Sequence, residues 1–459
     1  MLSSLLLIGI SVGVEWETQY ILEDPDYYYY NPMVTLDNQG KVHIAYIHWD
    51  HAVDTGNLNV ISNQSGEWIS ETVASVNYPI LWGDLYDIEV DSQGNRYLSY
   101  IEYISKFRIY LWLATDTSGE FESERIGTPF PYSQGSQSIE LDGNDNPFIA
   151  FLQFNYNTFE LELRFGWFEQ DSFVSERVVL DSVDNESLGN LLLEKDGTPH
   201  IIYVGYEHRL YHAFKTDEVW DKERIWYFLP LRPSAVMDTD DFIHVIYRSG
   251  DWSIRYAHNR EGEWIDEHII ATFRWGYDIT CIDIDPDGIP CFVWTHGTSN
   301  ENRQQTDISY ARQLENGWFE ETVTETPNVV EIPGEHNFFK IDKAGYAHLV
   351  YEYWDREFSK LAYAKSKAPL FVAEQPNEVN PFDLRVRGST VHFSLPEASL
   401  IRLDLYDAVG RRVRLLASGV YNSGQHSIPI NSTGLPAGVY FIRLESADRT
   451  SSAKSVLSR

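Results

Sequence analysis

The chain has 459 residues, of which 43% are hydrophobic and 14% aromatic, a composition that is typical of a folded, β-rich protein and excludes a disordered one. Its formal net charge of −34 repels phosphate, so nucleic acid, anionic lipid and sulfated or uronate-rich glycans are not expected as partners. The sequence has no run of eighteen apolar residues, so no transmembrane segment is expected.

Residues 1–13 contain the apolar run "LLLIGI", which the small residues "SVG" follow. This order is typical of a secretory signal and its cleavage site. The positive segment that usually precedes the apolar run is missing, because the first basic residue is Lys41. We interpret residues 1–13 as a candidate signal-peptide remnant.

One motif recurs along the next 340 or so residues: an alternating strand, a turn that contains Asp, and a second alternating strand. Its seven copies read "VTLDNQGKVHIAYI" (34–47), "IEVDSQGNRYLSYI" (88–101), "IELDGNDNPFIAFL" (139–152), "LLLEKDGTPHIIYV" (191–204), "AVMDTDDFIHVIYR" (235–248), "IDIDPDGIPCFVW" (282–294) and "FKIDKAGYAHLVYE" (339–352). The turns are about 51 residues apart. Such a period indicates a repeat architecture.

Each hairpin is followed by a third strand, such as "ISYARQ" (308–313), and most by a Trp-Glu strand, such as "GEWIDEHII" (262–270). Four antiparallel strands, repeated radially, form a β-propeller. The seventh repeat has no fourth strand of its own, whereas the chain begins with "VEWETQYI". We therefore predict an all-β fold, with a seven-bladed β-propeller over residues 14–368 that the N-terminal strand closes, so that no sheet edge is left open.

The composition changes after the seventh repeat. Residues 369–381 read as a polar, Pro-containing linker. Residues 380–459 hold 10 Lys and Arg against 6 Asp and Glu, whereas the preceding residues hold 25 against 63. Short alternating strands fill residues 382–459, which suits a small Ig-like β-sandwich.

Motifs in this C-terminal part follow the order of a known family: "NPF" (380–382), "FSLP" (393–396), "LYDAVGRRVRLL" (405–416), "GQHSI" (424–428), "LPAGVYFIRLE" (435–445) and "AKSVL" (453–457). They resemble the C-terminal sorting domain of type IX secretion cargo and related Ig-like domains of bacterial surface proteins. The resemblance implies contact with outer-membrane secretion machinery, and a protein that is secreted or held on the outer surface of a bacterium. The propeller repeats also resemble those of bacterial propellers in general, a class without a single function.

Several residues invite a metal interpretation. His43, His200, His244 and His348 share one repeat position, and equivalent positions on separate blades do not converge, so packing is favoured. Asp283, Asp285 and Asp287 resemble the start of a calcium loop, but the twelfth position is Trp294 and the segment is also a repeat turn. We expect a turn and no cofactor, with calcium as the alternative.

Cys281 and Cys291 lie on the two arms of one predicted hairpin, so a disulfide and two buried thiols both fit. Catalytic motifs are missing: the sequence has no sialidase box of the form S-x-D-x-G-x-x-W, no G-x-S-x-G, no H-E-x-x-H and no phosphate loop. A glycosidase carboxylate pair is defined by its separation in space, so the sequence does not test it.

In a propeller, the loops from second to third strand and from outer strand to next inner strand open on one face, which we call the loop face. Here these loops are rich in aromatic residues beside Asp, Asn and His. Such a surface suits a sugar, because rings stack on C–H faces while polar groups take the hydroxyls. The predicted ligand-binding residues are Tyr29, Tyr30, Trp82, Tyr132, Trp275 and Tyr277.

The leading prediction is thus a secreted or surface-attached binding protein that holds a glycan or a peptide on its loop face. The alternative is an extracellular polysaccharide-degrading enzyme, lyase or hydrolase, with His48, His51, His296 and His336 as the nearest catalytic candidates. A protein-interaction scaffold is the third hypothesis.

Overall fold

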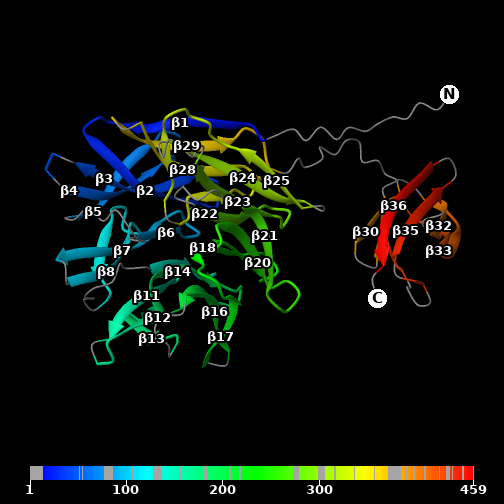
Figure 1. Ribbon diagram of the computed structural model, residues 1–459, viewed down its shortest axis with the longest axis horizontal. Helices are drawn as coiled ribbons and strands as arrows, with labels where there is room; N and C mark the ends of the chain where they lie inside the picture. Colours follow the sequence, from blue (N-terminus) through cyan, green and yellow to red (C-terminus); the bar gives the residue numbers. More distant parts are fainter. Residues whose placement is uncertain are drawn as a thin grey trace. The chain divides into compact units, whose positions relative to one another are not determined.

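The structure is a computed structural model, and every element assigned in it is a β-strand (Figure 1). It describes residues 14–50, 52–53, 55–76, 86–105, 108–127, 137–155, 157–179, 183–205, 208–216, 219–271, 279–297, 305–314, 317–334, 336–355, 357–370, 384–387, 390–395, 398–407, 410–422, 424–430, 435–436, 438–446 and 449–457. The chain divides into two compact units, residues 1–371 and 372–459. In the described part, no helix is long and apolar enough to cross a bilayer.

The first unit is built from four-stranded antiparallel sheets that follow one another along the chain. The first three sheets comprise β2 (Tyr27–Leu36), β3 (Val42–Asp50), β4 (Thr55–Ser62) and β5 (Ile69–Val76); β6 (Tyr86–Val90), β7 (Arg96–Ser105), β8 (Arg108–Thr115) and β9 (Glu122–Arg125); and β10 (Gln137–Leu141), β11 (Pro147–Asn155), β12 (Glu160–Glu169) and β13 (Ser172–Arg177).

The next three sheets repeat this order. They comprise β14 (Val183–Leu193), β15 (Pro199–Gly205), β16 (Arg209–Thr216) and β17 (Val219–Trp226); β18 (Leu231–Met237), β19 (Ile243–Arg248), β20 (Ser253–His258) and β21 (Ile265–Ala271); and β22 (Thr280–Ile284), β23 (Pro290–Gly297), β24 (Thr306–Leu314) and β25 (Gly317–Thr322).

The seventh sheet joins the two ends of the first unit. It contains β27 (Phe339–Ile341), β28 (Ala347–Trp354) and β29 (Ser359–Ser366), and its fourth strand is β1 (Trp16–Glu23). β1 pairs antiparallel with β29, with Trp16 opposite Ser366, which is the closure that the sequence predicts. A short extra strand, β26 (Val330–Ile332), links β24 to β28.

The repeat turns form for a local reason. Asp37 Oδ1 accepts hydrogen bonds from the N–H groups of Gln39 and Lys41, each at 2.8 Å, and Gly40 then takes a φ of 74°, which glycine adopts without steric cost. The same pair of carboxylate bonds recurs at Asp91, Asp142, Asp238, Asp285 and Asp342. The Asp and Gly of the motif are therefore structural residues.

The sheets follow one another around a common centre, in chain order from blue to yellow in Figure 1. Hydrogen bonds join successive inner strands: a side chain of one strand accepts from a backbone N–H of the next, as in Asp87 with Ile139 (3.1 Å), Ser138 with Leu191 (3.2 Å), Asn190 with Ala235 (2.7 Å) and Ser234 with Ile282 (3.3 Å). Val34 N–H donates to the Asn337 carbonyl at 2.6 Å, and β27 contacts β2. The first unit is thus a closed β-propeller.

Apolar side chains from neighbouring sheets pack together between the blades. Leu111 of β8, for example, lies in one buried cluster with Ile139 of β10 and Ile149 of β11. Cys281 and Cys291 are also buried there and are not bonded to each other. Of the two arrangements that the sequence allows, the structure therefore contains the buried thiols.

The second unit is a small β-sandwich. One sheet contains β30 (Leu384–Arg387), β31 (Thr390–Leu395) and β34 (Gly424–Pro429), and the other contains β33 (Arg412–Tyr421), β32 (Ser399–Asp407), β35 (Gly438–Ser446) and β36 (Arg449–Leu457). Alternate residues point inward, so Leu403, Leu405 and Ile442 are fully buried with Val391 of the facing sheet. The sandwich agrees with the prediction for this part of the chain.

Candidate functional site

The loop face is where the sequence predicts a ligand. Five of the predicted side chains, Trp82, Tyr132, Trp275, Tyr277 and His51, lie outside the residues that the structure describes. The others are described, and they divide into buried and partly exposed groups.

Tyr29 differs from the prediction. Only 2% of the residue is exposed, because its ring is stacked on His48, with centroids 5.4 Å apart, and packs against Tyr46 at 6.0 Å. Burial raises the pKa of its hydroxyl well above the ordinary range. Tyr29 is therefore a core residue, and its ring is not presented to a ligand. Tyr30 is partly buried and stacks on Tyr28 at 5.7 Å.

The catalytic candidates belong to different parts of the ring. His48 lies on β3 against Tyr27, with ring centroids 4.1 Å apart, and burial lowers its pKa. His296 lies on β23, 3.3 Å from Ser309 Oγ, and burial lowers its pKa as well. His336 lies between β26 and β27 and is 7% exposed. The contacts of His48 and His296 thus place the two rings in separate sheets, the first and the sixth.

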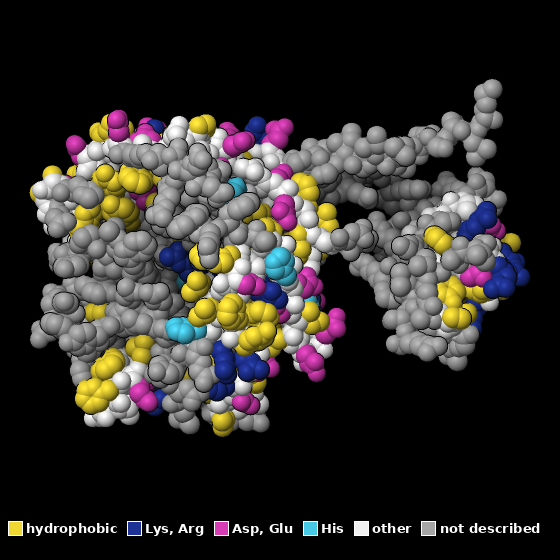
Figure 2. Space-filling model, viewed as in Figure 1, with side chains coloured by type: hydrophobic (Ala, Val, Ile, Leu, Met, Phe, Trp, Pro, Cys, Tyr) yellow, Lys and Arg dark blue, Asp and Glu magenta, His cyan; other side chains and the backbone are white. Residues whose placement is uncertain are grey.

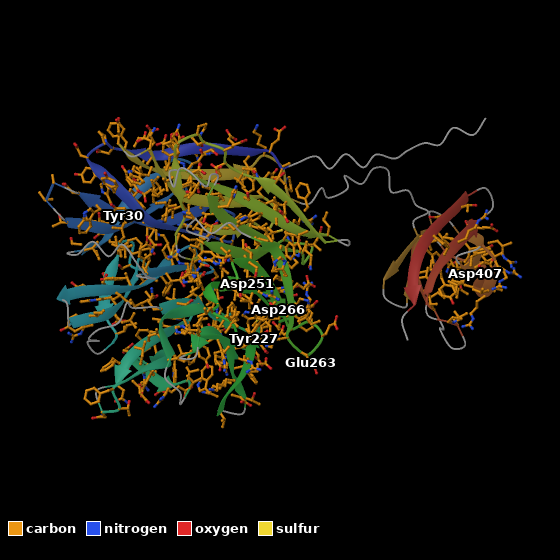
Figure 3. The ribbon with its side chains drawn as sticks, viewed as in Figure 1. Tyr30, Tyr227, Asp251, Glu263, Asp266 and Asp407 are labelled. Carbon is orange, nitrogen blue, oxygen red and sulfur yellow. The ribbon has the colours of Figure 1, made fainter. Side chains whose placement is uncertain are left out.

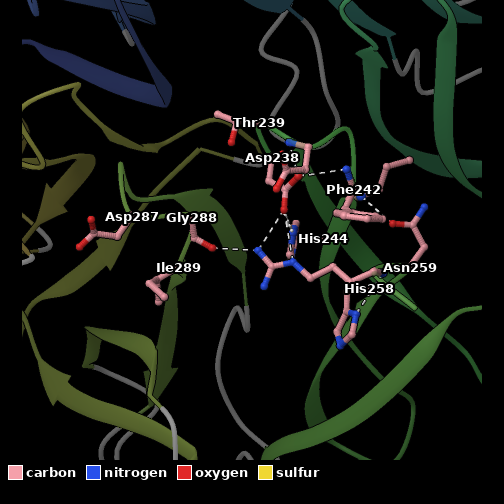
Figure 4. A network of polar contacts seen from close by, with 12 residues as sticks. Asp238, Thr239, Phe242, His244, His258, Asn259, Asp287, Gly288 and Ile289 are labelled. Carbon is pink, nitrogen blue, oxygen red and sulfur yellow. Dashed lines mark hydrogen bonds and ion pairs between the residues drawn. The ribbon is translucent and has the colours of Figure 1, made fainter. Parts of the chain in front are cut away.

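The histidines at the shared repeat position pack inside single blades. His244 is fully buried; its Nε2 lies 3.1 Å from Asp238 Oδ2, and its Nδ1 lies 2.5 Å from the Tyr256 hydroxyl. Arg260 binds the same Asp238 oxygen at 2.9 Å and reaches the carbonyl of Gly288 in the next blade (Figure 4). Burial lowers the pKa of His244 to about 4, so the ring is neutral at pH 7 and ties the turn to the sheet.

The three aspartates of the calcium-like segment have different partners. Asp285 uses one oxygen for its own turn and the other for Arg312, at 2.9 and 2.6 Å. Asp283 accepts from the N–H of Ile341 in the next blade at 2.6 Å, and Asp287 is exposed. Within the described residues, no three His, Cys, Asp or Glu side chains are grouped to hold a metal ion. The segment behaves as a repeat turn.

The central channel contains a cavity of about 510 Å³ that Glu89, Glu140 and Lys340 line. We call Glu89, Glu140 and the neighbouring Asp283 the channel carboxylates. Burial raises the pKa of Glu89 to about 7 and that of Glu140 well above its ordinary value. Burial alone would lower the pKa of Lys340, but the charges of Glu89 and Asp283 outweigh it and raise that pKa. Lys340 thus offsets part of the negative charge of the channel.

The described part of the loop face carries an apolar surface between β17 and β18. We call it the 227–231 patch; its members are Tyr227, Phe228, Leu229 and Leu231, which are 63%, 43%, 41% and 43% exposed. Tyr227 is labelled in Figure 3, and in the same view Figure 2 shows hydrophobic side chains gathered at this place. Isolated exposed apolar residues are ordinary, whereas a contiguous group of them marks an interaction site.

Polar contacts hold the backbone of the 227–231 patch. The carbonyl of Phe228 accepts hydrogen bonds from Trp226 Nε1 and Ser249 Oγ, both at 3.1 Å. Gly250 lies directly beneath, where a Cβ would stand 2.7 Å from Leu229 Cβ. Leu229 adopts a φ of 39°, a strained conformation for a branched side chain that persists only where its surroundings hold it. The loop is therefore built to display these side chains.

A second layer supports Trp226. The Arg255 guanidinium lies 4.0 Å over the Trp226 ring, and Asp266 binds Arg255 Nε at 2.7 Å and the Tyr247 hydroxyl at 2.6 Å. These cation–π and ion-pair contacts hold the Trp226 ring in place, directly before the first residue of the patch.

Sequence reasoning missed this patch, although a pattern was available. The segment "YFLPL" (227–231) places four large apolar residues where a turn between blades is expected. Polar residues normally fill such a turn, and an apolar run there indicates either a buried loop or a displayed surface. Only the tertiary structure distinguishes the two.

Comparison with known proteins adds little about the propeller. No curated protein matches the chain. Similar solved structures include a triple mutant of AofleA from Arthrobotrys oligospora (14% identity, 68% of this chain and 90% of that chain, TM-score 0.44) and the intramolecular trans-sialidase from Ruminococcus gnavus in complex with oseltamivir carboxylate (12%, 76% and 96%, 0.41). PorZ, a surface component of the type-IX secretion system of Porphyromonas gingivalis, is also similar (10%, 93% and 70%, 0.32). Likenesses this weak do not identify a ligand.

The C-terminal unit is different, because it matches a family model. Residues 387–458 match the secretion system C-terminal sorting domain, which covers all the strands of the sandwich after β30. The resemblance found in the sequence is therefore confirmed. The chain carries a sorting domain of the type IX secretion system, and the protein is exported to the cell surface or the extracellular space.

Proposed function

We propose that this exported protein acts by binding, and that its propeller holds an apolar peptide segment of another protein on the 227–231 patch. The observation that carries the proposal is the exposure of four large apolar side chains on one strained, tethered loop. Complete burial of an exposed side chain of this size contributes about 1.5 to 3 kcal/mol, and these residues are about half exposed, so each contributes about half of that when a partner covers it. Together the four side chains supply about 3 to 6 kcal/mol, which corresponds to a weak, reversible complex.

The chemistry of the patch favours a peptide over a sugar. Hydroxyl groups need donors and acceptors when they leave water. The polar groups beneath the patch, Trp226 Nε1, Ser249 Oγ and the Phe228 carbonyl, already bind one another. Tyr227 and Phe228 have flat rings, but Leu229 and Leu231, the other half of the patch, offer no flat surface for a sugar ring. Apolar side chains of a peptide meet neither difficulty.

Other partners fit this surface less well. Residues 1–379 hold 25 Lys and Arg against 63 Asp and Glu, so a second propeller and an anionic bilayer are both repelled. A neutral or basic segment avoids that repulsion. The expected partner is therefore a peptide that pairs two or more large apolar residues with no excess of acidic ones.

The test uses the full chain on an array of 12-residue peptides and, in parallel, an array of neutral glycans. We expect saturable binding to apolar peptides, weakened about tenfold or more, or 1.4 kcal/mol, in the double variant Tyr227→Ser, Phe228→Ser. Val219→Ser is the matched control, because Val219 is 66% exposed but lies outside the patch. Binding that the double variant leaves unchanged would refute the role of the patch, and glycan binding that depends on Tyr227 would replace the peptide by a sugar.

A further inference from the structure

A second pocket lies at the opposite ends of the strands from the loop face, where the repeat turns are. Its volume is about 450 Å³, within the range of small-molecule sites of about 300 to 1,000 Å³. It is formed between the third and fourth sheets and is lined by Phe148, Phe165, Trp167, Asp196, Gly197, Thr198, Pro199 and Lys215.

The pocket coincides with a departure from the repeat. Phe148 of β11 occupies the position that His43, His200, His244 and His348 hold in other blades, where His200, His244 and His348 bind the acidic residue of their own turn. Phe148 has no polar atom for this purpose and stacks on Phe165, with ring centroids 5.5 Å apart and an interplanar angle of 10°. Asp142 of that turn binds Asn146 Nδ2 instead, at 3.1 and 3.0 Å.

Three aromatic rings thus form one wall. Phe165 continues from Phe148 to Trp167, with centroids 5.7 Å apart. The Trp220 ring also packs edge-on against Phe165, with ring centroids 5.5 Å apart. Trp220 Nε1 donates a hydrogen bond to Glu176 at 2.7 Å. Phe148 and Trp167 are both partly exposed, so the wall presents ring surface to the pocket.

Polar groups form the other side. Lys215 Nζ lies 2.9 Å from Glu176 Oε1 and 5.8 Å from the centre of the Trp167 ring. Asp196 Oδ1 accepts from the N–H of Thr198 at 2.9 Å. Hydrogen bonds from Thr198 lower the pKa of Asp196, so the carboxylate is ionised at neutral pH. The rim therefore offers a carboxylate acceptor, a hydroxyl and an ammonium donor close to a flat aromatic wall.

We propose that this pocket binds a neutral saccharide ring, with its C–H face on Trp167 and Phe148 and its hydroxyls toward Asp196, Thr198 and Lys215. Stacking on aromatic rings with hydroxyls held at the rim is the combination that sugar recognition requires. The Asp196 and Lys215 charges are opposite, and Lys215 is paired with Glu176, so the site does not call for a charged ligand. The acidic surroundings disfavour an anionic sugar.

The probes are D-glucose, D-galactose, D-mannose, L-fucose and N-acetyl-D-glucosamine, each added to the full chain and followed by saturation-transfer NMR and calorimetry. We expect at least one to bind, with affinity reduced tenfold or more in Trp167→Leu. Asp196→Asn keeps an oxygen that accepts from Thr198 and so preserves the turn while it removes the carboxylate, and the same reduction is expected. If Trp167→Leu fails to fold, the affinity of Asp196→Asn for the sugar tests the proposal.

Tyr227→Ser serves as the control, because it alters the loop face and leaves this pocket intact. The two proposals are therefore separable: peptide binding depends on Tyr227, and saccharide binding on Trp167 and Asp196. The pocket proposal is overturned if none of the five sugars binds at 10 mM, the roughly millimolar limit of useful affinity, or if bound sugar is unaffected by both pocket variants.

Discussion

Glu352 gives a quantitative test of how the ring is held closed. It lies on β28, is 3% exposed, and accepts a hydrogen bond from Ser359 Oγ at 2.7 Å. The same hydroxyl accepts from the N–H of Tyr29 at 3.1 Å, so the chain of bonds joins the seventh sheet to the first. Burial raises the pKa of Glu352 from 4.5 to about 8.

The direction of the pH dependence follows from the protonation of Glu352 in the folded and the unfolded state. Below pH 4.5 the carboxyl is protonated both folded and unfolded; between pH 4.5 and 8 the unfolded chain ionises it while the folded protein keeps the proton. The folded state then binds more protons, so stability falls as pH rises through this window. At about 1.4 kcal/mol for each pKa unit, the full loss is about 5 kcal/mol, of which about 3 to 4 kcal/mol falls between pH 5 and pH 8.

The variant Glu352→Gln removes the ionisation and keeps an oxygen for Ser359. Urea unfolding is followed by tryptophan fluorescence, which reports the propeller alone because all 14 Trp residues lie at or before Trp354. We expect the pH 5 to pH 8 loss of unfolding free energy to be about 3 kcal/mol smaller in the variant than in the wild type, whereas exposed Glu120→Gln leaves the loss unchanged. Equal losses in Glu352→Gln and wild type would show that burial of this carboxyl does not control the closure.

Three further outcomes are expected. Lys340→Met leaves the channel carboxylates without their cation. The free energy of unfolding should therefore drop by about 3 to 5 kcal/mol at pH 8 and by less at pH 5; an equal drop at both pH values would contradict the ion pairing. Deletion of residues 14–23 leaves the outer edge of β29 unpaired. We expect the Tm to fall by roughly 10 °C or more and size-exclusion chromatography to show oligomers; a stable monomer would refute closure by β1. Gly250→Ala drives a Cβ toward Leu229 and should weaken apolar-peptide binding about tenfold with Tm shifted by no more than about 3 °C; unchanged affinity would show that the loop is not held from below.

Local patterns account for what the sequence predicts correctly. Alternation of apolar residues, Asp at the start of most turns and Gly at the fourth position of most turns specify hairpins without reference to distant residues. Even the closure was predictable, because the seventh repeat lacks one strand and the first residues supply it. The sorting domain was recognisable since its motifs run in one continuous segment of the chain.

The candidate sites depend on packing between blades, which no local pattern specifies. Tyr29 and Tyr30 are adjacent in one aromatic run, yet packing against His48 and Tyr46 puts Tyr29 in the core, whereas Tyr30 stays partly accessible. The run that ends in Leu231 could equally have been buried; Gly250 and Ser249, from a different hairpin, hold it at the surface.

By itself, therefore, the sequence determined the repeat and the exported C-terminal domain, because each depends on residues close together in the chain. It also determined the strand that closes the ring, because the seventh repeat lacks a strand that the N-terminal residues supply. Only the tertiary structure decided that the 227–231 patch is displayed and that Phe148 opens a pocket beside Trp167 and Asp196. These features arise where separate blades meet, and the geometry of such a meeting depends on side-chain volumes and hydrogen bonds contributed by residues tens of positions apart.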